Sequence, residues 1–210
     1  MNLFIFFKKC FKCVLFMLYR FFNLNHPEKK KIIIFGLPLS GKTSIIYFLK
    51  LGYLITTVRT LFINEETFSI EIKNDKNDFK TKSYEISLYE IGQQCSYNLI
   101  KQYSDVSDDL IYIVDSTQMG ELSEARDDFI RIIYEFRFIY KKCKFLIFLN
   151  KQDSNGCLKS EEIIKYFALP KELMCRSRFV PCSTLSGKGL KEGIEWILGD
   201  DMLLELTQNK

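Results

Sequence analysis

Residues 36–43, with the sequence GLPLSGKT, have the composition and spacing of a phosphate-binding loop. They fit the pattern G-x-x-x-x-G-K-S/T, directly after the apolar run KIIIF and before a helical pattern. In such a loop the backbone N–H groups point at phosphate oxygens, aided by the N-terminus of the following helix. The lysine ammonium is expected to meet the β- and γ-phosphates, and the threonine hydroxyl to bind Mg²⁺. The predicted phosphate-binding residues are Gly36, Leu37, Pro38, Leu39, Ser40, Gly41, Lys42 and Thr43.

A second motif, the tetrapeptide NKQD, indicates which base the nucleotide carries. It ends the apolar run KFLIFL, where a base would lie. The Asp153 carboxylate can accept hydrogen bonds from both N1–H and the 2-amino group of guanine, a donor pair that adenine lacks. We expect the stem of Lys151 to cover the base and Asn150 to tie this loop to the phosphate loop. Further along the chain, Ser183 and Thr184 are placed to offer a backbone N–H to the guanine oxygen.

The elements that position these motifs read as an alternation of strands and helices. KIIIF, LIYIV and KFLIFL are continuous apolar runs, typical of buried parallel strands, and RFVPC is a shorter one. FSIEI and SYEISL alternate with period two, which predicts an antiparallel hairpin. Helices are expected over residues 42–51, SEARDDFIRIIYEFRFI, SEEIIKYFAL and GLKEGIEWIL. The predicted class is an α/β P-loop fold with a mostly parallel sheet, one antiparallel edge hairpin and helices on both faces. Such folds bind ligands at the carboxyl ends of their strands.

The first 24 residues are strongly apolar but interrupted by charge. The charge-free run at residues 13–19 is too short to cross a bilayer, which needs about 20 residues. On a helical projection the basic side chains gather on one arc and most aromatic and aliphatic side chains on the other, although Phe16 and Tyr19 spoil the polar arc. This pattern favours an amphipathic helix that lies in a membrane interface.

Other interpretations of this segment stay open. A signal peptide or membrane anchor, and a helix packed on protein alone, are the alternatives. Asn at position 2 excludes N-myristoylation, whereas Cys10 and Cys13 could carry palmitate as a second membrane signal.

Charge and cysteine content narrow the class further. The chain has a net charge of +4, and residues 1–31 hold seven basic side chains against one acidic, so the remainder is close to neutral. Without a basic stripe in that remainder, nucleic acid is not an expected partner. Seven cysteines do not suggest a disulfide framework, and with one histidine in the chain a zinc site is disfavoured. We therefore expect a reducing compartment.

Several stretches make the sequence resemble the ADP-ribosylation factor (ARF) and ARF-like (ARL) family of small GTPases. They are TTVRTLFINEET at residues 56–67, LYEIGQQ at 88–94, VDS at 114–116, SEAR at 123–126 and NKQD at 150–153. The first two match the family's two switch segments. The resemblance covers nearly the whole chain and implies the small G-protein fold in a divergent member of the family.

The resemblance also implies roles for individual residues. Thr60 would reach Mg²⁺ in the GTP state, and Glu90 stands where the family has an aspartate that holds Mg²⁺ through water. Gln93 would offer its backbone N–H to the γ-phosphate. Gln94 matches the catalytic glutamine that orients the attacking water, with an ordinary exposed switch residue as an equal alternative. The exposed hydrophobic triad that contacts effectors in the family corresponds to Ile63, Tyr89 and Tyr103.

The departures from the family pattern lie at residues expected to bind the metal and the γ-phosphate and in the first switch segment. Glu90 replaces an aspartate, Gln93 and Phe62 replace glycines, and Arg59 replaces a proline. The extra methylene of Glu90 could displace the metal, and Gln93 lacks the conformational freedom of glycine. The hairpin connection KNDKNDFKTK is longer than usual, so whether the hairpin slides when GTP binds, expelling the N-terminal helix as in the family, is open. We find no arginine finger in cis and therefore expect slow hydrolysis without an activating protein.

The predicted function is a guanine-nucleotide switch of the ARF/ARL type that binds GTP or GDP with Mg²⁺ and acts in vesicle trafficking. Its expected partners are a membrane surface, an exchange factor, a GTPase-activating protein and effectors. We expect a monomer, cytoplasmic and peripheral on the cytosolic face of an intracellular membrane. One alternative is a membrane-bound GTP-binding scaffold with little turnover, similar to the β subunit of the signal-recognition-particle receptor. A small-molecule kinase is a third, but the sequence offers no arginine-bearing lid.

Three segments divide the chain in this interpretation. Residues 1–27 form the membrane-associating helix and linker, residues 28–200 the GTP-binding domain, and residues 201–210 a tail.

Overall fold

The computed structural model describes residues 27–73 and 81–199. The predicted N-terminal helix, the tip of the hairpin and the C-terminal tail lie outside these ranges. The chain divides into two compact units, and the described part of the smaller one is residues 27–29, 69–73 and 81–85. There, Lys29 forms an ion pair with Glu85 at 3.4 Å. All residues of the predicted nucleotide site belong to the larger unit, residues 30–68 and 86–210.

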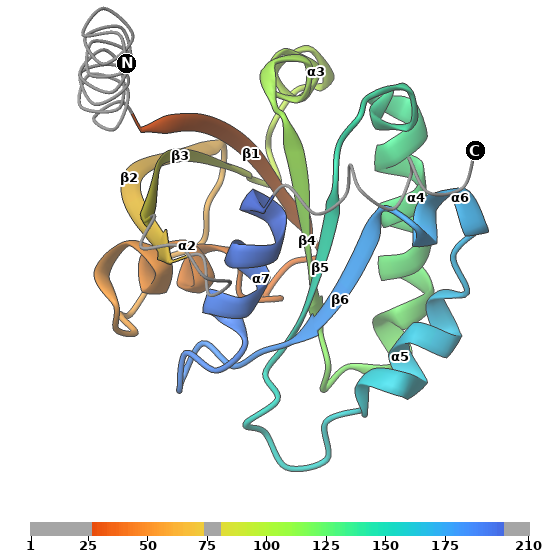
Figure 1. The fold of residues 1–210 in the computed structure, drawn as a ribbon. Coiled ribbons are helices and arrows are strands. Elements are labelled where there is room, and N and C mark those ends of the chain that lie inside the picture. The colour runs from red at the N-terminus through yellow and green to blue at the C-terminus, as the bar shows by residue number, and fades with distance from the viewer. Residues whose placement is uncertain (1–26, 74–80, 200–210) are drawn as a thin grey trace, which may run out of the picture. The chain divides into compact units, whose positions relative to one another are not determined.

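A six-stranded sheet carries the fold, with the order β2-β3-β1-β4-β5-β6 (Figure 1). The strands are β1 (Glu28–Gly36), β2 (Ile63–Lys73), β3 (Thr81–Ile91), β4 (Asp109–Asp115), β5 (Phe145–Asn150) and β6 (Ser177–Pro181). The pairs β1–β4, β4–β5 and β5–β6 are parallel, with Ile32 opposite Asp109, Leu110 opposite Phe145 and Phe145 opposite Ser177. The hairpin strands β2 and β3 are antiparallel, and Thr67 meets Ser87 across them at 2.9 Å. The predicted fold class is confirmed.

Helices of the larger unit cover both faces of its strands. The α-helices are α2 (Lys42–Leu51), α3 (Tyr97–Val106), α4 (Leu122–Glu135), α5 (Ser160–Phe167), α6 (Lys171–Met174) and α7 (Leu190–Leu198). Two 3₁₀ turns, η1 (Met119–Glu121) and η2 (Phe138–Tyr140), flank α4. Helices α2 and α7 contact each other on one face, and α4 and α5 contact each other on the opposite face.

The alternation of side chains along the strands explains this covering. Ile33 and Phe35 of β1 join the core beneath α4, with Phe129 and Ile133 from the helix. Every residue of β4 and of β5 is buried, as expected for parallel strands covered on both faces. The predicted apolar face of α4 is confirmed by burial of Ala125, Phe129, Ile132 and Ile133.

The elements differ from the prediction in several places. Helix α3 was not predicted; Ser96 caps it by accepting a hydrogen bond from the Leu99 N–H. Helix α4 ends at Glu135, shortly before Arg137 takes a left-handed φ of 61°. Ser160 is the first residue of α5 and not its cap, since the capping bond joins the Glu162 side chain to the Lys159 N–H.

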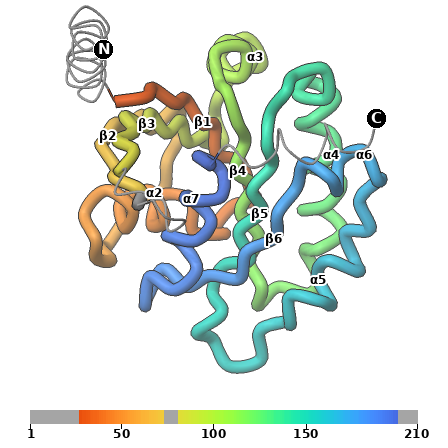
Figure 2. Tube along the Cα trace, in the orientation of Figure 1, coloured from red at the N-terminus to blue at the C-terminus, as the bar shows by residue number. Residues whose placement is uncertain are grey.

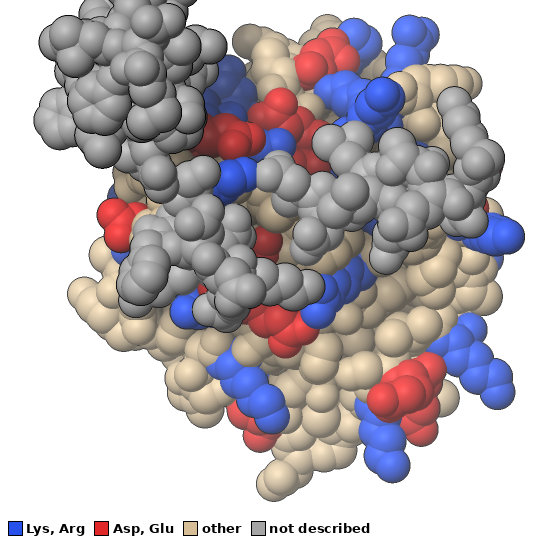
Figure 3. All heavy atoms as spheres, viewed as in Figure 1, with Lys and Arg blue, Asp and Glu red and all other residues tan. Residues whose placement is uncertain are grey.

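The described part of the chain also bears on cysteine chemistry and membrane insertion. Its five cysteines are free thiols. None of its helices is long and apolar enough to serve as a membrane span. On the face shown in Figure 3, basic and acidic side chains of the described residues are interspersed.

Candidate nucleotide-binding site

The phosphate loop leaves the carboxyl end of β1 and leads into α2, on the side of the sheet where β4 and β5 also end (Figure 2). Positions 36 and 41 both need glycine, because a side chain has no room there and because the backbone φ is positive. A Cβ on Gly36 would lie 2.5 Å from the carbonyl oxygen of Ile113, and one on Gly41 would lie 2.3 Å from Nδ2 of Asn150. Both glycines also have positive φ, 143° and 99°. Any side chain at either position would therefore push the loop off its neighbours.

Lys42 is held inside this loop by the loop's own carbonyls. Its Nζ donates hydrogen bonds to the carbonyl oxygens of Gly36 at 2.8 Å and Leu37 at 2.9 Å. Burial lowers the pKa of Lys42, and the Glu90 carboxylate opposes that effect. A partly desolvated ammonium fixed at a glycine-rich loop is a strong electrostatic partner for phosphate, because little water screens it.

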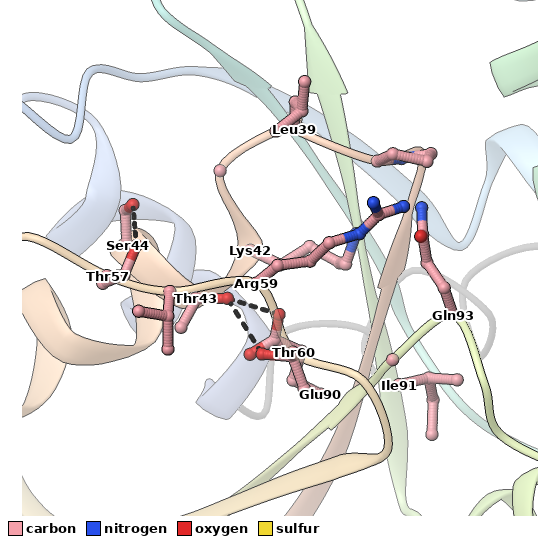
Figure 4. Close-up of a pocket in the computed structure, with 14 residues that line it drawn as sticks. Leu39, Lys42, Thr43, Ser44, Thr57, Arg59, Thr60, Glu90, Ile91 and Gln93 are labelled. Atoms are coloured by element: carbon pink, nitrogen blue, oxygen red, sulfur yellow. Dashed lines mark hydrogen bonds between the residues drawn. The ribbon is translucent and has the colours of Figure 1, made fainter.

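The three predicted metal ligands lie together beside the loop (Figure 4). The Thr43 hydroxyl donates to Oε1 of Glu90 at 2.6 Å and lies 3.2 Å from the Thr60 hydroxyl. The side chains bring together hard oxygen ligands with one carboxylate, the donor set that suits Mg²⁺ when substrate phosphates complete its shell. No group of three His, Cys, Asp or Glu side chains in the described ranges offers another metal site. The residues present therefore fit a magnesium ion bound with a nucleotide.

The extra methylene of Glu90 is accommodated by a neighbour that sequence reasoning missed. Asn64, at the start of the hairpin, donates from Nδ2 to Oε2 of Glu90 at 3.1 Å. The carboxylate is 2 % exposed, and each of its oxygens accepts one hydrogen bond. Because Asn64 and Glu90 lie 26 residues apart on different strands, no local pattern reveals the pair.

The loop that carries the NKQD motif is tied to the phosphate loop by the hydrogen bond expected from the sequence. Asn150 donates from Nδ2 to the carbonyl oxygen of Ser40 at 2.9 Å, across 110 residues of chain. Lys151, with a left-handed φ of 67°, directs its ammonium to Oδ2 of Asp115 at 2.5 Å. Burial favours the neutral form of Asp115, but the bonds from Lys151 and Thr117 outweigh it and lower the pKa of this carboxyl. The loop is therefore fixed by a charged pair as well as by Asn150.

Asp153 is exposed at the rim of a cavity of about 400 Å³, which Gln152 and Ser183 also line. The Ser183 N–H already donates to the carbonyl oxygen of Lys188 at 3.0 Å. Of the two predicted backbone donors, the N–H of Thr184 is the one with no hydrogen bond to another described residue.

The switch residues form the other wall of the phosphate pocket. Lys42, Thr43, Thr60, Glu90 and Gln93 all line a cavity of about 200 Å³ at the phosphate loop. A residue that sequence reasoning had not placed there, Arg59, lines it as well and points into it (Figure 4).

Gln94, the predicted catalytic residue, is exposed and is not among the residues that line this cavity. Its N–H donates to the carbonyl oxygen of Leu61 at 2.7 Å, and the Gly92 N–H donates to that of Phe62 at 2.6 Å. These bonds pair the two switch segments with each other.

The hydrophobic triad differs from the exposed arrangement that the resemblance implies. Tyr89 is 5 % exposed, and its ring meets that of Tyr103 edge-on at 4.9 Å between centroids. Ile63 and Tyr103 are partly buried against the same core.

The fold and the two joined loops define a P-loop nucleotide-binding domain of the small GTPase class. The model of the ADP-ribosylation factor family matches residues 17–200. The chain therefore belongs to the ADP-ribosylation factor family.

Two similar proteins agree with this assignment. The ADP-ribosylation factor-like protein 2 of Dictyostelium discoideum is 29% identical over 180 residues, which cover 85% of this chain and 91% of the relative. A solved structure of the Arl6 BBS3 small GTPase from Trypanosoma brucei, with a bound nucleotide analogue GppNp, matches with a TM-score of 0.62 at 23% identity. That match covers 87% of this chain and 99% of the other, and it shows a shared fold.

Proposed function

We propose that this protein is a guanine-nucleotide switch that binds GTP and GDP with Mg²⁺ and hydrolyses GTP slowly. The observation that carries the proposal is the hydrogen bond from Asn150 to Ser40, which joins a base-reading loop to a phosphate loop. In this proposal Asp153 reads the guanine edge, Lys42 meets the β- and γ-phosphates, and the Gln93 N–H faces the γ-phosphate.

The metal would be held by Thr43, Thr60 and Glu90, whose oxygens already lie together. When bound, it supplies positive charge that neutralises phosphate oxygens. In the proposal Gln94 orients the attacking water, which requires it to leave its place outside the cavity.

The membrane role rests on residues 1–27, with their basic and aromatic pattern. We propose that this segment attaches the GTP-binding domain, residues 28–200, to the cytosolic face of an intracellular membrane. The protein would act there as a monomer in vesicle trafficking, under an exchange factor, an activating protein and effectors.

Mass spectrometry of the nucleotide that co-purifies with the full chain tests the binding proposal. We expect GDP or GTP, released when Mg²⁺ is chelated. Stoichiometric ATP, with no guanine nucleotide bound, would contradict the proposal and support the alternative of a small-molecule kinase.

A second candidate is a membrane-bound GTP-binding scaffold with little turnover. It is favoured by Gln94 lying outside the cavity and by Glu90 already hydrogen-bonded to Thr43. Single-turnover hydrolysis separates the two. Complete retention of GTP, with and without candidate activating proteins, supports the scaffold and contradicts the switch.

A further inference from the structure

Arg59 is an exposed cation that lines the phosphate pocket and has no partner among the described residues. Its side chain extends across the cavity that Lys42 and Gln93 line, and it points toward Gln93 (Figure 4). Nothing in the ranges that the structure describes forms a hydrogen bond or ion pair with its guanidinium. Because the residue is exposed, water solvates its charge, and the guanidinium is available to a ligand that enters the cavity.

The carboxylate that lines the cavity beside Arg59 is already engaged by other residues. Glu90 is the one carboxylate among the described residues that line the cavity, and both of its oxygens are engaged by Thr43 and Asn64. Lys42 lines the same cavity, so two cationic side chains border the space at the phosphate loop. An anion that carries several charges and enters this cavity would attract both Arg59 and Lys42.

The backbone on the carboxyl side of Arg59 is fixed. The next residue, Thr60, lies 3.2 Å from Thr43 through their hydroxyls. The two residues after it accept hydrogen bonds from the second switch segment, Leu61 from Gln94 and Phe62 from Gly92. These bonds fix the point from which the Arg59 side chain extends, and the planar fork of a guanidinium can donate to two phosphate oxygens.

We propose that Arg59 is a catalytic residue that the chain supplies in cis to the terminal phosphate of bound GTP, which rests on the proposed function above. In hydrolysis, the oxygen of water bonds to the γ-phosphorus while the bond from that phosphorus to the β–γ bridging oxygen breaks. The bridging oxygen leaves with the electron pair as part of GDP, and the water gives up a proton as orthophosphate forms. Negative charge that shifts onto these oxygens is stabilised by the guanidinium.

This assignment has two consequences. The protein should favour GTP over GDP more than it would without Arg59, because GDP lacks the group that the guanidinium contacts. It should also hydrolyse GTP at about 10⁻² s⁻¹, the scale of switches with an arginine in cis, and not at the roughly 30-fold lower rate of those without one.

The test compares Arg59→Gln and Arg59→Lys with Arg178→Gln, which removes an exposed arginine paired with Glu192 on β6. Affinities for fluorescent GDP and GTP are measured first on the full chain, and single-turnover hydrolysis then follows. We expect Arg59→Gln to lower the hydrolysis rate by about 30-fold and the GTP-to-GDP preference several-fold, with GDP affinity unchanged. Arg59→Lys should fall between, because it keeps the charge and loses the fork, and Arg178→Gln should match the unaltered protein.

Each other outcome overturns a distinct statement. Tight GTP binding with an unaltered hydrolysis rate and nucleotide preference in Arg59→Gln overturns the role of Arg59 and leaves the switch intact. If both variants bind GDP and GTP more weakly by the same factor, the catalytic role of Arg59 is overturned as well, because such a result indicates a structural role. Should Arg59→Gln fail to fold, the rate and preference of Arg59→Lys decide. Failure of the unaltered protein to bind either guanine nucleotide overturns the proposed function itself.

Discussion

At the residue scale, the proposed base specificity depends on side chains that lie apart from the phosphate loop in the sequence. Asp153 stands at the rim of its cavity with both carboxylate oxygens free of described partners, whereas Lys151 and Asn150 of the same motif are engaged by the protein. The motif thus divides its work. Asn150 and Lys151 hold the loop in place, and in the proposed function Asp153 contacts the base.

Replacing Asp153 by Asn should therefore change the base that is accepted. An amide offers one donor and one acceptor, so it loses a charge-assisted bond to guanine and gains a match to the 2-oxo group of xanthine. We expect GTP affinity to fall about 100-fold and xanthosine triphosphate affinity to rise, as measured by competition with fluorescent GDP. Asp127→Asn, an exposed carboxylate on α4, serves as the matched control. Unaltered selectivity in Asp153→Asn would place the base elsewhere.

Site residues could be predicted from the sequence where they belong to a contiguous motif, and not where they act through a distant partner. The phosphate loop and the base motif are contiguous, and the sequence predicted both, together with the bond between them. Asn64 could not be predicted, since it acts only through the carboxylate of Glu90 on the neighbouring strand. Arg59 was visible as a departure from the family pattern, but its direction into the pocket depends on Thr60 and Thr43 meeting from different segments.

At the element scale, α7 lies close to the sheet because a glycine faces it. A Cβ on Gly193 would lie 2.4 Å from the ring of Phe148 and 3.2 Å from the side chain of Leu146 on β5, both fully buried. This helix follows residues 182–184, which are proposed to contact the base, and it packs directly on the strand that leads into the NKQD motif.

Gly193→Val should weaken the fold through this contact. We expect a loss of about 1–3 kcal/mol in the free energy of unfolding, because the branched side chain overpacks a core that cannot widen. Gly120→Val provides the control, since a Cβ there meets nothing within 4 Å, and its effect should stay within about 0.5 kcal/mol. Urea denaturation followed by fluorescence measures both, and equal stabilities would show that α7 can shift away.

The elements themselves were predicted where hydrophobic pattern is strong. The buried runs of β1, β4 and β5 and the apolar face of α4 are all found. Helix α3 was missed because it buries only Ser104 fully and mixes polar and apolar residues along its length. The end of α4 was placed too late because FRFI continues the apolar pattern, whereas the left-handed Arg137 breaks the helix.

At the scale of the whole molecule, the parallel sheet brings distant segments to one edge. β1, β4 and β5 all end there, so the phosphate loop, Asp115 and the NKQD motif become neighbours although they are spread over more than half the chain. The proposed membrane segment, residues 1–24, adds a second output to this arrangement, since nucleotide state would govern its exposure.

Binding to vesicles should therefore depend on the nucleotide. We expect the full chain to co-sediment with phosphatidylserine-containing vesicles more strongly with a non-hydrolysable GTP analogue than with GDP. Replacing Lys8, Lys9 and Lys12 together by Gln should weaken binding about 100-fold, at about 1 kcal/mol per lysine. The same change at Lys142, Lys165 and Lys171, which are exposed on the body, is the control. Equal sedimentation in both nucleotide states would contradict a coupled switch.

The backbone bonds from Gly92 to Phe62 and from Gln94 to Leu61 carry a last consequence. The two segments that would contact the γ-phosphate are paired through their backbones. They also lie close together, since a Cβ on Gly92 would lie 2.3 Å from the carbonyl oxygen of Phe62. A change of path in one segment breaks these two bonds unless the other segment moves with it. A partner that binds one segment would therefore detect the conformation of both, because the two segments change together.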